Sequence, residues 1–88
     1  MARYIVERTI PKLSQTELQS IGKNAAKVAD QLPGVVWIKS SISESEGKSY
    51  CEFDAPNPDV LREHAQKAGL PVDRITAIER EIDPSMFR

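Results

Sequence analysis

The residues best suited to chemistry are Cys51 and His64, the only cysteine and the only histidine of the chain. Thiolates and imidazoles carry much of the metal-binding and nucleophilic chemistry of proteins. A structural zinc site needs about four nitrogen or sulfur ligands, and the chain has no C-x-x-C, H-x-x-x-H or H-E-x-x-H spacing. A complete structural zinc site within one chain is therefore excluded unless carboxylates supply most of its ligands.

His64 is the first candidate for a metal ligand, because imidazole suits nickel, copper and zinc, and carboxylates can complete the coordination shell. Glu63 precedes it directly, and Glu52 lies in the strand-like run before it. A weak or dimer-shared site would use His64 with Glu52, Glu63, Asp54 or water. Two other interpretations stay open. His64 lies near the inward edge of its predicted helix, where it could bond a backbone carbonyl or act as a general acid or base.

Cys51 lies in the middle of a predicted strand, where a free cysteine is usually a small buried hydrophobe. Strand alternation points it to one face and Tyr50 and Glu52 to the other. A Cys–His nucleophile pair would also need an oxyanion hole and an orienting third group, and the sequence signals neither. Trp37 and Tyr50 are large aromatic residues with a polar end, so they either line a cavity or pack an interface. We take Trp37, Tyr50 and Cys51 as the candidate cavity-lining residues.

Six segments must position these side chains. Alternating β-branched and aromatic residues predict strands at 3–9, 35–43, 48–55 and 74–82. A capping box from Ser14 to Glu17 begins a helix with an apolar stripe at spacings of three and four, and this helix ends before Pro33. Asn57, followed by a proline at the first helical position, begins a shorter helix that Gly69 stops.

The order β-α-β-β-α-β predicts a ferredoxin-like α+β domain that spans residues 1–88, with two helices on one face of a four-stranded antiparallel sheet. We expect the first and last strands to be central. Large side chains occur on both strand faces, namely Tyr4, Ile5, Val6, Trp37, Ile38, Tyr50, Phe53, Ile75 and Ile78. Because two helices cannot cover both faces, we expect a homodimer whose sheets pack face to face beside a cavity, a dimeric α+β barrel.

The composition limits the kinds of partner that we expect this protein to bind. Twelve basic and thirteen acidic side chains give a net charge of −1 and are interspersed, so we expect no nucleic-acid partner. The first residues lack the apolar run of a signal peptide and no stretch reaches membrane-spanning length, so we expect no membrane partner. A single cysteine makes no internal disulfide. We therefore expect a cytoplasmic location.

Several stretches together resemble the small DUF4242 family. They are "RYIVERTIP", "GVVWIKSSIS", "SYCEFDAPNPDVLREHAQKAGLPVDRI" and "IEREIDP", which cover nearly the whole chain. The resemblance implies a ferredoxin-like, generally dimeric fold. It also implies metal binding, since the family includes a nickel-binding member, and nickel is the one metal or cofactor it suggests. His64, in "REHA", matches the family's characteristic histidine. The chain has Lys39 where the family pattern often has a histidine, and a charged lysine cannot ligate a metal.

Three functions stay open at this stage. The first is a dimeric protein that binds nickel, or a similar transition metal, with His64 as principal ligand. The second is a cofactor-independent enzyme or small-molecule-binding protein in which Trp37, Tyr50, Glu52 and His64 supply polar contacts. The third is a structural or interaction module with no ligand.

Overall fold

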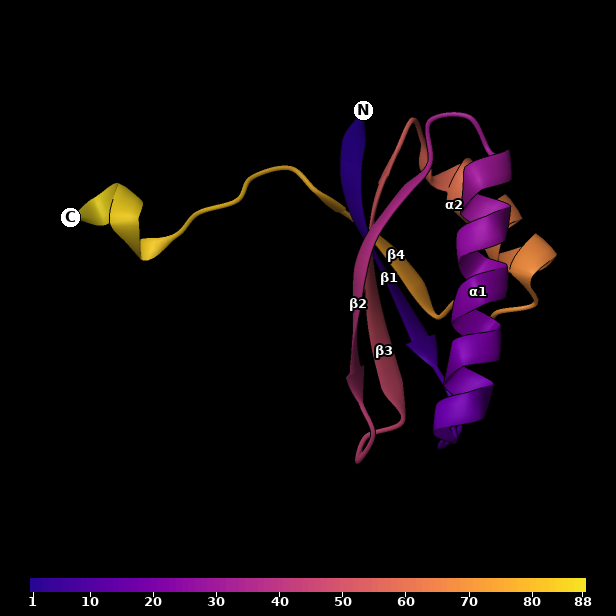
Figure 1. The fold of residues 1–88 in the computed structure, drawn as a ribbon. Helices are drawn as coiled ribbons and strands as arrows, with labels where there is room; N and C mark the ends of the chain where they lie inside the picture. Colours follow the sequence, from indigo (N-terminus) through magenta and orange to yellow (C-terminus); the bar gives the residue numbers. More distant parts are fainter.

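The computed structural model describes residues 1–88. In chain order the elements are β1 (Ala2–Thr9), α1 (Gln15–Gln31), β2 (Val36–Ser43), β3 (Lys48–Ala55), α2 (Pro58–Ala68), β4 (Arg74–Ile78) and a short 3-10 helix, η1 (Pro84–Phe87). The strands form one antiparallel sheet in the order β2-β3-β1-β4. Both helices lie on one side of it (Figure 1). The predicted ferredoxin-like α+β fold is confirmed.

The predicted place and length of the last strand are wrong. β3 and β1 are central, and β4 is an edge strand beside β1. Each helix connects two strands that are separated by a third, so β4 can join the sheet only outside β1. β4 also ends at Ile78 rather than at Ile82, because Ile78 pairs with Arg3 and β1 begins only one residue earlier. Beyond Ile78 the chain has no partner strand to pair with.

Local hydrogen bonds begin both helices as predicted. The Ser14 hydroxyl accepts from the amide of Glu17 at 3.1 Å, and the Glu17 carboxylate accepts from the amide of Ser14 at 2.9 Å. Asn57 Oδ1 accepts from the amide of Val60 at 2.9 Å. Gly69 ends α2 with a φ of 70°, the left-handed conformation that a glycine adopts without strain. These bonds satisfy backbone groups that a helix terminus otherwise leaves open.

The core fills only part of the space between the sheet and the helices. Ten buried residues form it: Tyr4, Val6, Val28, Ala29, Leu32, Val35, Cys51, Phe53, Ala55 and Leu61. The core residues that α1 and its C-cap supply, namely Val28, Ala29 and Leu32, all lie in or directly after the second half of this helix. Leu18, which the apolar stripe also points inward, is 36% exposed. The first half of α1 therefore does not contribute to the core.

The outer face of the sheet is mixed rather than apolar. Five of the nine large side chains face or pack against the core, namely Tyr4, Val6, Trp37, Phe53 and Ile75, whereas Ile5, Tyr50 and Ile78 lie on the other face. Charged side chains share this face: Arg3 Nε lies 2.9 Å from Asp54 Oδ1, and Lys48 Nζ lies 3.0 Å from Asp73 Oδ2.

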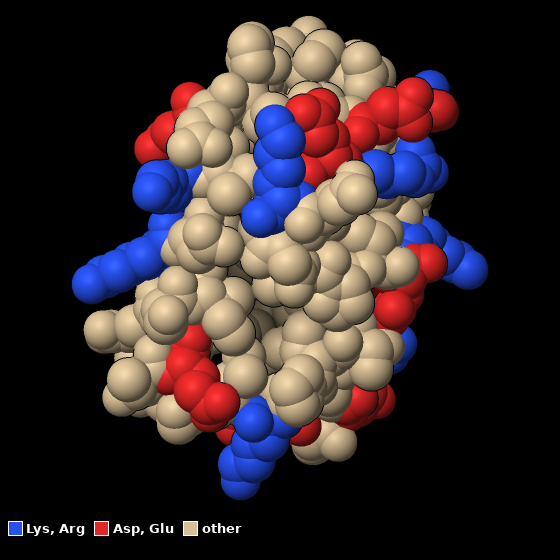
Figure 2. Space-filling view, turned by 90° about the vertical axis from the view of Figure 1, so that its right-hand side faces the viewer, with Lys and Arg blue, Asp and Glu red and all other residues tan.

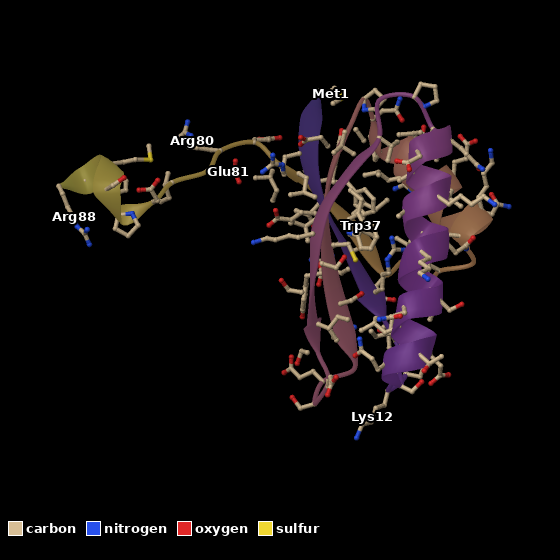
Figure 3. All side chains as sticks on the ribbon, in the orientation of Figure 1. Met1, Lys12, Trp37, Arg80, Glu81 and Arg88 are labelled. Atoms are coloured by element: carbon tan, nitrogen blue, oxygen red, sulfur yellow. The ribbon has the colours of Figure 1, made fainter.

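The chain after β4 projects away from the helices, as Arg80, Glu81 and Arg88 show in Figure 3. One ion pair connects it to the sheet, since Arg3 Nη1 lies 3.5 Å from Glu81 Oε1. Asp83 caps η1 by accepting from the amide of Ser85. Elsewhere in the fold, neither α1 nor α2 has the length and apolar character needed to cross a membrane.

Candidate functional site

A cavity of about 230 Å³ lies between the first half of α1, the sheet and α2. Its wall is mainly apolar and comes from every element except β4 and η1. The lining residues are Arg8, Ile10, Pro11, Leu13, Leu18, Ile21, Gly22, Ala25, Trp37, Ser40, Ile42, Ser49, Cys51, Phe53, His64, Gly69, Leu70 and Pro71. Figure 2 shows the helix side of the molecule, whose middle is largely uncharged and hollowed, while most charged side chains lie toward its rims.

The cavity exists because small residues stand where larger ones would complete the core. On α1 these are Gly22 and Ala25, and on the facing strands Ser40, Ser49 and Cys51. Gly22 is the clearest case, since a Cβ at this position would meet no atom within 4 Å. Glycine inside a helix costs stability relative to alanine. The sequence thus keeps an unfavourable residue at a point where a side chain would enter the cavity.

His64 is 1% exposed and lines this cavity from α2. Its Nε2 lies 2.9 Å from the carbonyl oxygen of Ala25. A carbonyl only accepts, so Nε2 carries the proton, and Nδ1 of the neutral ring is an acceptor. Nδ1 is buried and has no partner. Burial lowers the pKa of His64 below its usual 6.5, against the effect of the Ala25 bond, and the nearby charge of Arg8 lowers it further.

The hydrogen bond to a backbone carbonyl that the sequence offered for His64 is therefore present. The side chain is, however, fully buried in the protein rather than at the boundary between the buried and the exposed side of α2. Its ring also packs edge-on against Phe53, with the ring centroids 5.2 Å apart. Both contacts fix the ring, so its free nitrogen is held in place beside the cavity.

Arg8 is a further site residue, which the sequence alone leaves open as either half of a buried pair with Glu7 or a polar feature of the cavity. It is 3% exposed and lines the cavity from β1. Its Nη1 donates to the carbonyl oxygen of Pro71 at 2.7 Å, whereas its Nε is buried without a partner. The signal was present in the strand alternation, because Arg8 has the same parity as Tyr4 and Val6, which face the core.

Trp37 and Cys51, two of the three residues predicted to line a cavity, line this one, which lies on the helix side of the sheet rather than at the sheet face of a dimer. Trp37 projects between the sheet and α1 (Figure 3), and its Nε1 donates to Ser40 Oγ at 2.9 Å. Cys51 is buried on the same side of the sheet, with its Sγ 3.9 Å from Ser49 Oγ. Tyr50 lies on the opposite face and is absent from the lining. Cys51 and His64 thus border the same cavity although they are thirteen positions apart in the sequence.

The carboxylates proposed as metal ligands lie elsewhere. Glu52 is on the outer face of β3, where Lys39 is its partner in the strand register. Glu63 is on the surface of α2 and pairs with Lys67 at 3.1 Å. The chain holds no group of three or more histidine, cysteine, aspartate or glutamate side chains that could bind a metal ion. The residues of one chain therefore do not fit a nickel site built on His64, Glu52 and Glu63.

Comparison with known proteins gives a family and a fold. A family model described as "Nickel responsive protein SCO4226-like" matches residues 4–78. In structure, the chain is similar to the crystal structure of SCO4226 from Streptomyces coelicolor A3(2), with a TM-score of 0.82 over 92% of this chain and 100% of that one. The two sequences are 15% identical, so this likeness shows the fold alone. No curated protein matches the chain in sequence.

Proposed function

The chain belongs to the SCO4226-like family of nickel-responsive proteins, and we propose that it works by binding a compact, mainly apolar organic molecule in the cavity beside α1. Ligand sites of proteins are typically preformed, mainly apolar hollows with a few convergent polar groups. The cavity has this character, since Arg8 and His64 interrupt a lining that is otherwise largely apolar.

The observation that carries this proposal is the open space at Gly22. A cavity of 230 Å³ exceeds the roughly 150 Å³ of an apolar cavity that accepts benzene. A side chain at Gly22 would occupy part of it without meeting another atom at its Cβ. An accidental packing defect would be relieved by almost any substitution at this position, whereas a binding site requires the glycine.

Octan-1-ol is a suitable probe, because Trp37 is the only tryptophan and lines the cavity. We expect saturable binding of octan-1-ol that changes the fluorescence of Trp37. Gly22→Leu should weaken the binding, because the leucine side chain occupies part of the cavity, while circular dichroism shows a folded protein. Lys27→Leu, at an exposed position of the same helix outside the lining, is the control and should bind as the wild type does. Absence of binding, or binding unchanged in Gly22→Leu, would contradict the proposal.

Nickel binding is a second candidate, favoured by the printed description of the family. We propose that any such site uses His64 as principal ligand through Nδ1, which has no partner. Its remaining ligands must come from outside the chain, since no group of three ligands exists within it. The earlier resemblance to the DUF4242 family points the same way and stays a prediction.

Titration calorimetry with Ni²⁺ tests this candidate on the wild type and on His64→Ala, Glu52→Gln and Glu63→Gln. A site built on His64 predicts that the first variant loses binding. Loss in Glu52→Gln with binding retained in His64→Ala would instead place the metal on the outer face of the sheet. Binding unaffected by all three substitutions would contradict the predicted ligand set.

We also propose that two copies associate through the outer faces of their sheets, in the cytoplasm. Ile5, Tyr50 and Ile78 supply apolar surface on this face. A domain of this size buries only about 60–70% of the surface that its unfolded chain exposes, so it gains stability from association.

A further inference from the structure

The segment 79–88, which follows β4, carries apolar side chains that lie far from the core. Ile82, Met86 and Phe87 are 66%, 60% and 73% exposed. The segment leaves the sheet on the side opposite the helices (Figure 1), which is the side on which we expect the second copy. Apolar side chains grouped on the surface of a protein usually mark an interaction site. The direction and the composition of this segment therefore both point to the second copy.

A groove of about 190 Å³ lies between α1 and the edge strand β2. Its lining is apolar except for one carboxylate, and consists of Ala26, Ala29, Asp30, Val35, Val36 and Trp37. An apolar cavity of roughly 150 Å³ accepts benzene, so this groove has room for a phenyl ring. The carboxylate of Asp30 has no ion-pair partner in the chain. The groove thus suits an aromatic side chain that is followed by a cation.

The register of the sheet places this groove at the level where the segment begins. Ile78 of β4 pairs with Arg3 of β1, and Arg3 also pairs with Asp54 of β3. Asp54 in turn pairs with Val36, which lines the groove. The row of these residues crosses the sheet from the β4 edge to the β2 edge.

The same row is shared by two copies that pack face to face about a twofold axis parallel to the strands. Rotation about this axis keeps each row at its level along the strands and places β4 of one copy over β2 of the other. The segment of one copy then leaves its sheet beside the edge of the second copy that carries the groove.

The segment is also long enough to reach the groove. Packed sheets lie about 10 Å apart. The stretch 79–83, between β4 and η1, spans at most about 17 Å when extended. η1 therefore reaches past the sheet of the second copy, to the space between that sheet and its α1, where the groove opens.

We propose that the segment 79–88 of each copy docks on the β2 edge of the other, with Phe87 in the groove and Arg88 beside Asp30; this rests on the association of two copies proposed above and not on the ligand. Arg88, like Asp30, has no ion-pair partner in a single chain. Because the exchange is reciprocal, each dimer buries two phenylalanine side chains in addition to the outer faces of the sheets.

Sedimentation velocity of Phe87→Ser over a range of protein concentrations tests the docked side chain. We expect the dissociation constant of the dimer to rise at least about 100-fold, because two buried phenylalanines are lost and each contributes about tenfold or more. Phe87 lies outside the core, so the monomer stays folded. Val72→Ser removes an exposed apolar side chain outside the groove and should leave the dissociation constant unchanged.

A disulfide tests which surface the segment contacts. Asp30→Cys and Arg88→Cys proteins, purified separately and then mixed under mild oxidation, should form a pair linked at these two positions, which peptide mass spectrometry identifies. Lys67→Cys, at an exposed position of α2 outside the groove, is the control in place of Asp30→Cys and should not link to Arg88→Cys above background.

The outcomes separate this inference from the association on which it rests. A wild type that stays monomeric at every concentration overturns both. A dimer whose dissociation constant is unchanged in Phe87→Ser overturns the inference and leaves the association of the sheets standing. Linking of Arg88→Cys to Lys67→Cys as readily as to Asp30→Cys places the segment on another surface and also overturns the inference.

Discussion

Replacing Gly22 with alanine measures directly whether the space beside α1 is open, and we expect the substitution to stabilise the fold. Glycine inside a helix costs about 0.5–1 kcal/mol relative to alanine. The new methyl group meets no atom within 4 Å, so no steric repulsion offsets this gain. The free energy of unfolding should rise by about 0.5–1 kcal/mol, which for a domain of this size raises Tm by about 2–8 °C.

Gly69→Ala is the matched control, because it makes the same chemical change in equally open space. A Cβ at Gly69 also meets no atom within 4 Å, but the φ there is +70°. Alanine in the left-handed conformation is strained by about 1–2 kcal/mol. The two substitutions should therefore shift stability in opposite directions. Urea unfolding followed by Trp37 fluorescence measures both at one protein concentration, so that any association is held constant.

A loss of stability in Gly22→Ala would refute the reasoning, because it would mean that the methyl group meets packed atoms and that the cavity is closed. The proposed organic ligand would then lose its site. A gain in Gly69→Ala would instead show that the end of α2 does not adopt the conformation described above.

Three further predictions concern pH and association. Because the pKa of His64 is lowered in the fold, the unfolded chain binds more protons than the folded one below pH 6.5. The free energy of unfolding should therefore be constant above about pH 7 and fall below that pH by at most about 1.4 kcal/mol per pH unit for this group. Urea unfolding at several pH values measures this slope, which His64→Gln should lack. The hydrogen bonds from Thr9 and Lys48 lower the pKa of Asp73, so Asp73→Asn should be less stable than the wild type at pH 7. Calorimetric scans should show this difference in stability vanish at pH values where Asp73 is protonated in both the folded and the unfolded state. Ile5→Lys should turn a dimer into a folded monomer in sedimentation velocity, because lysine opposite Glu52 suits the single sheet but not an apolar interface. A dimer that survives Ile5→Lys would show that association uses another surface.

Much of the fold could be predicted from the sequence because its determinants are local. Ser14 and Glu17 bond to each other's backbone within one turn, and Asn57 does the same at α2. Alternation along β3 placed Cys51 and Tyr50 on opposite faces of the sheet, because successive residues of a strand point to opposite faces, and the structure shows that the face of Cys51 is the buried one. His64 was also found from the sequence, as the one imidazole on the apolar side of its helix.

The tertiary structure alone decided what surrounds His64. Arg8 and His64 are more than fifty residues apart, and they border one cavity only because β1 pairs with β3 and α2 packs over that pair. The same packing placed Glu52 on the far side of the sheet and so separated it from the histidine. The empty space beside Gly22 has no local signal at all, since its volume depends on the distance between α1 and the sheet. Helices and strands follow from contacts within a few residues, whereas a cavity depends on how separate elements fail to fill the space between them.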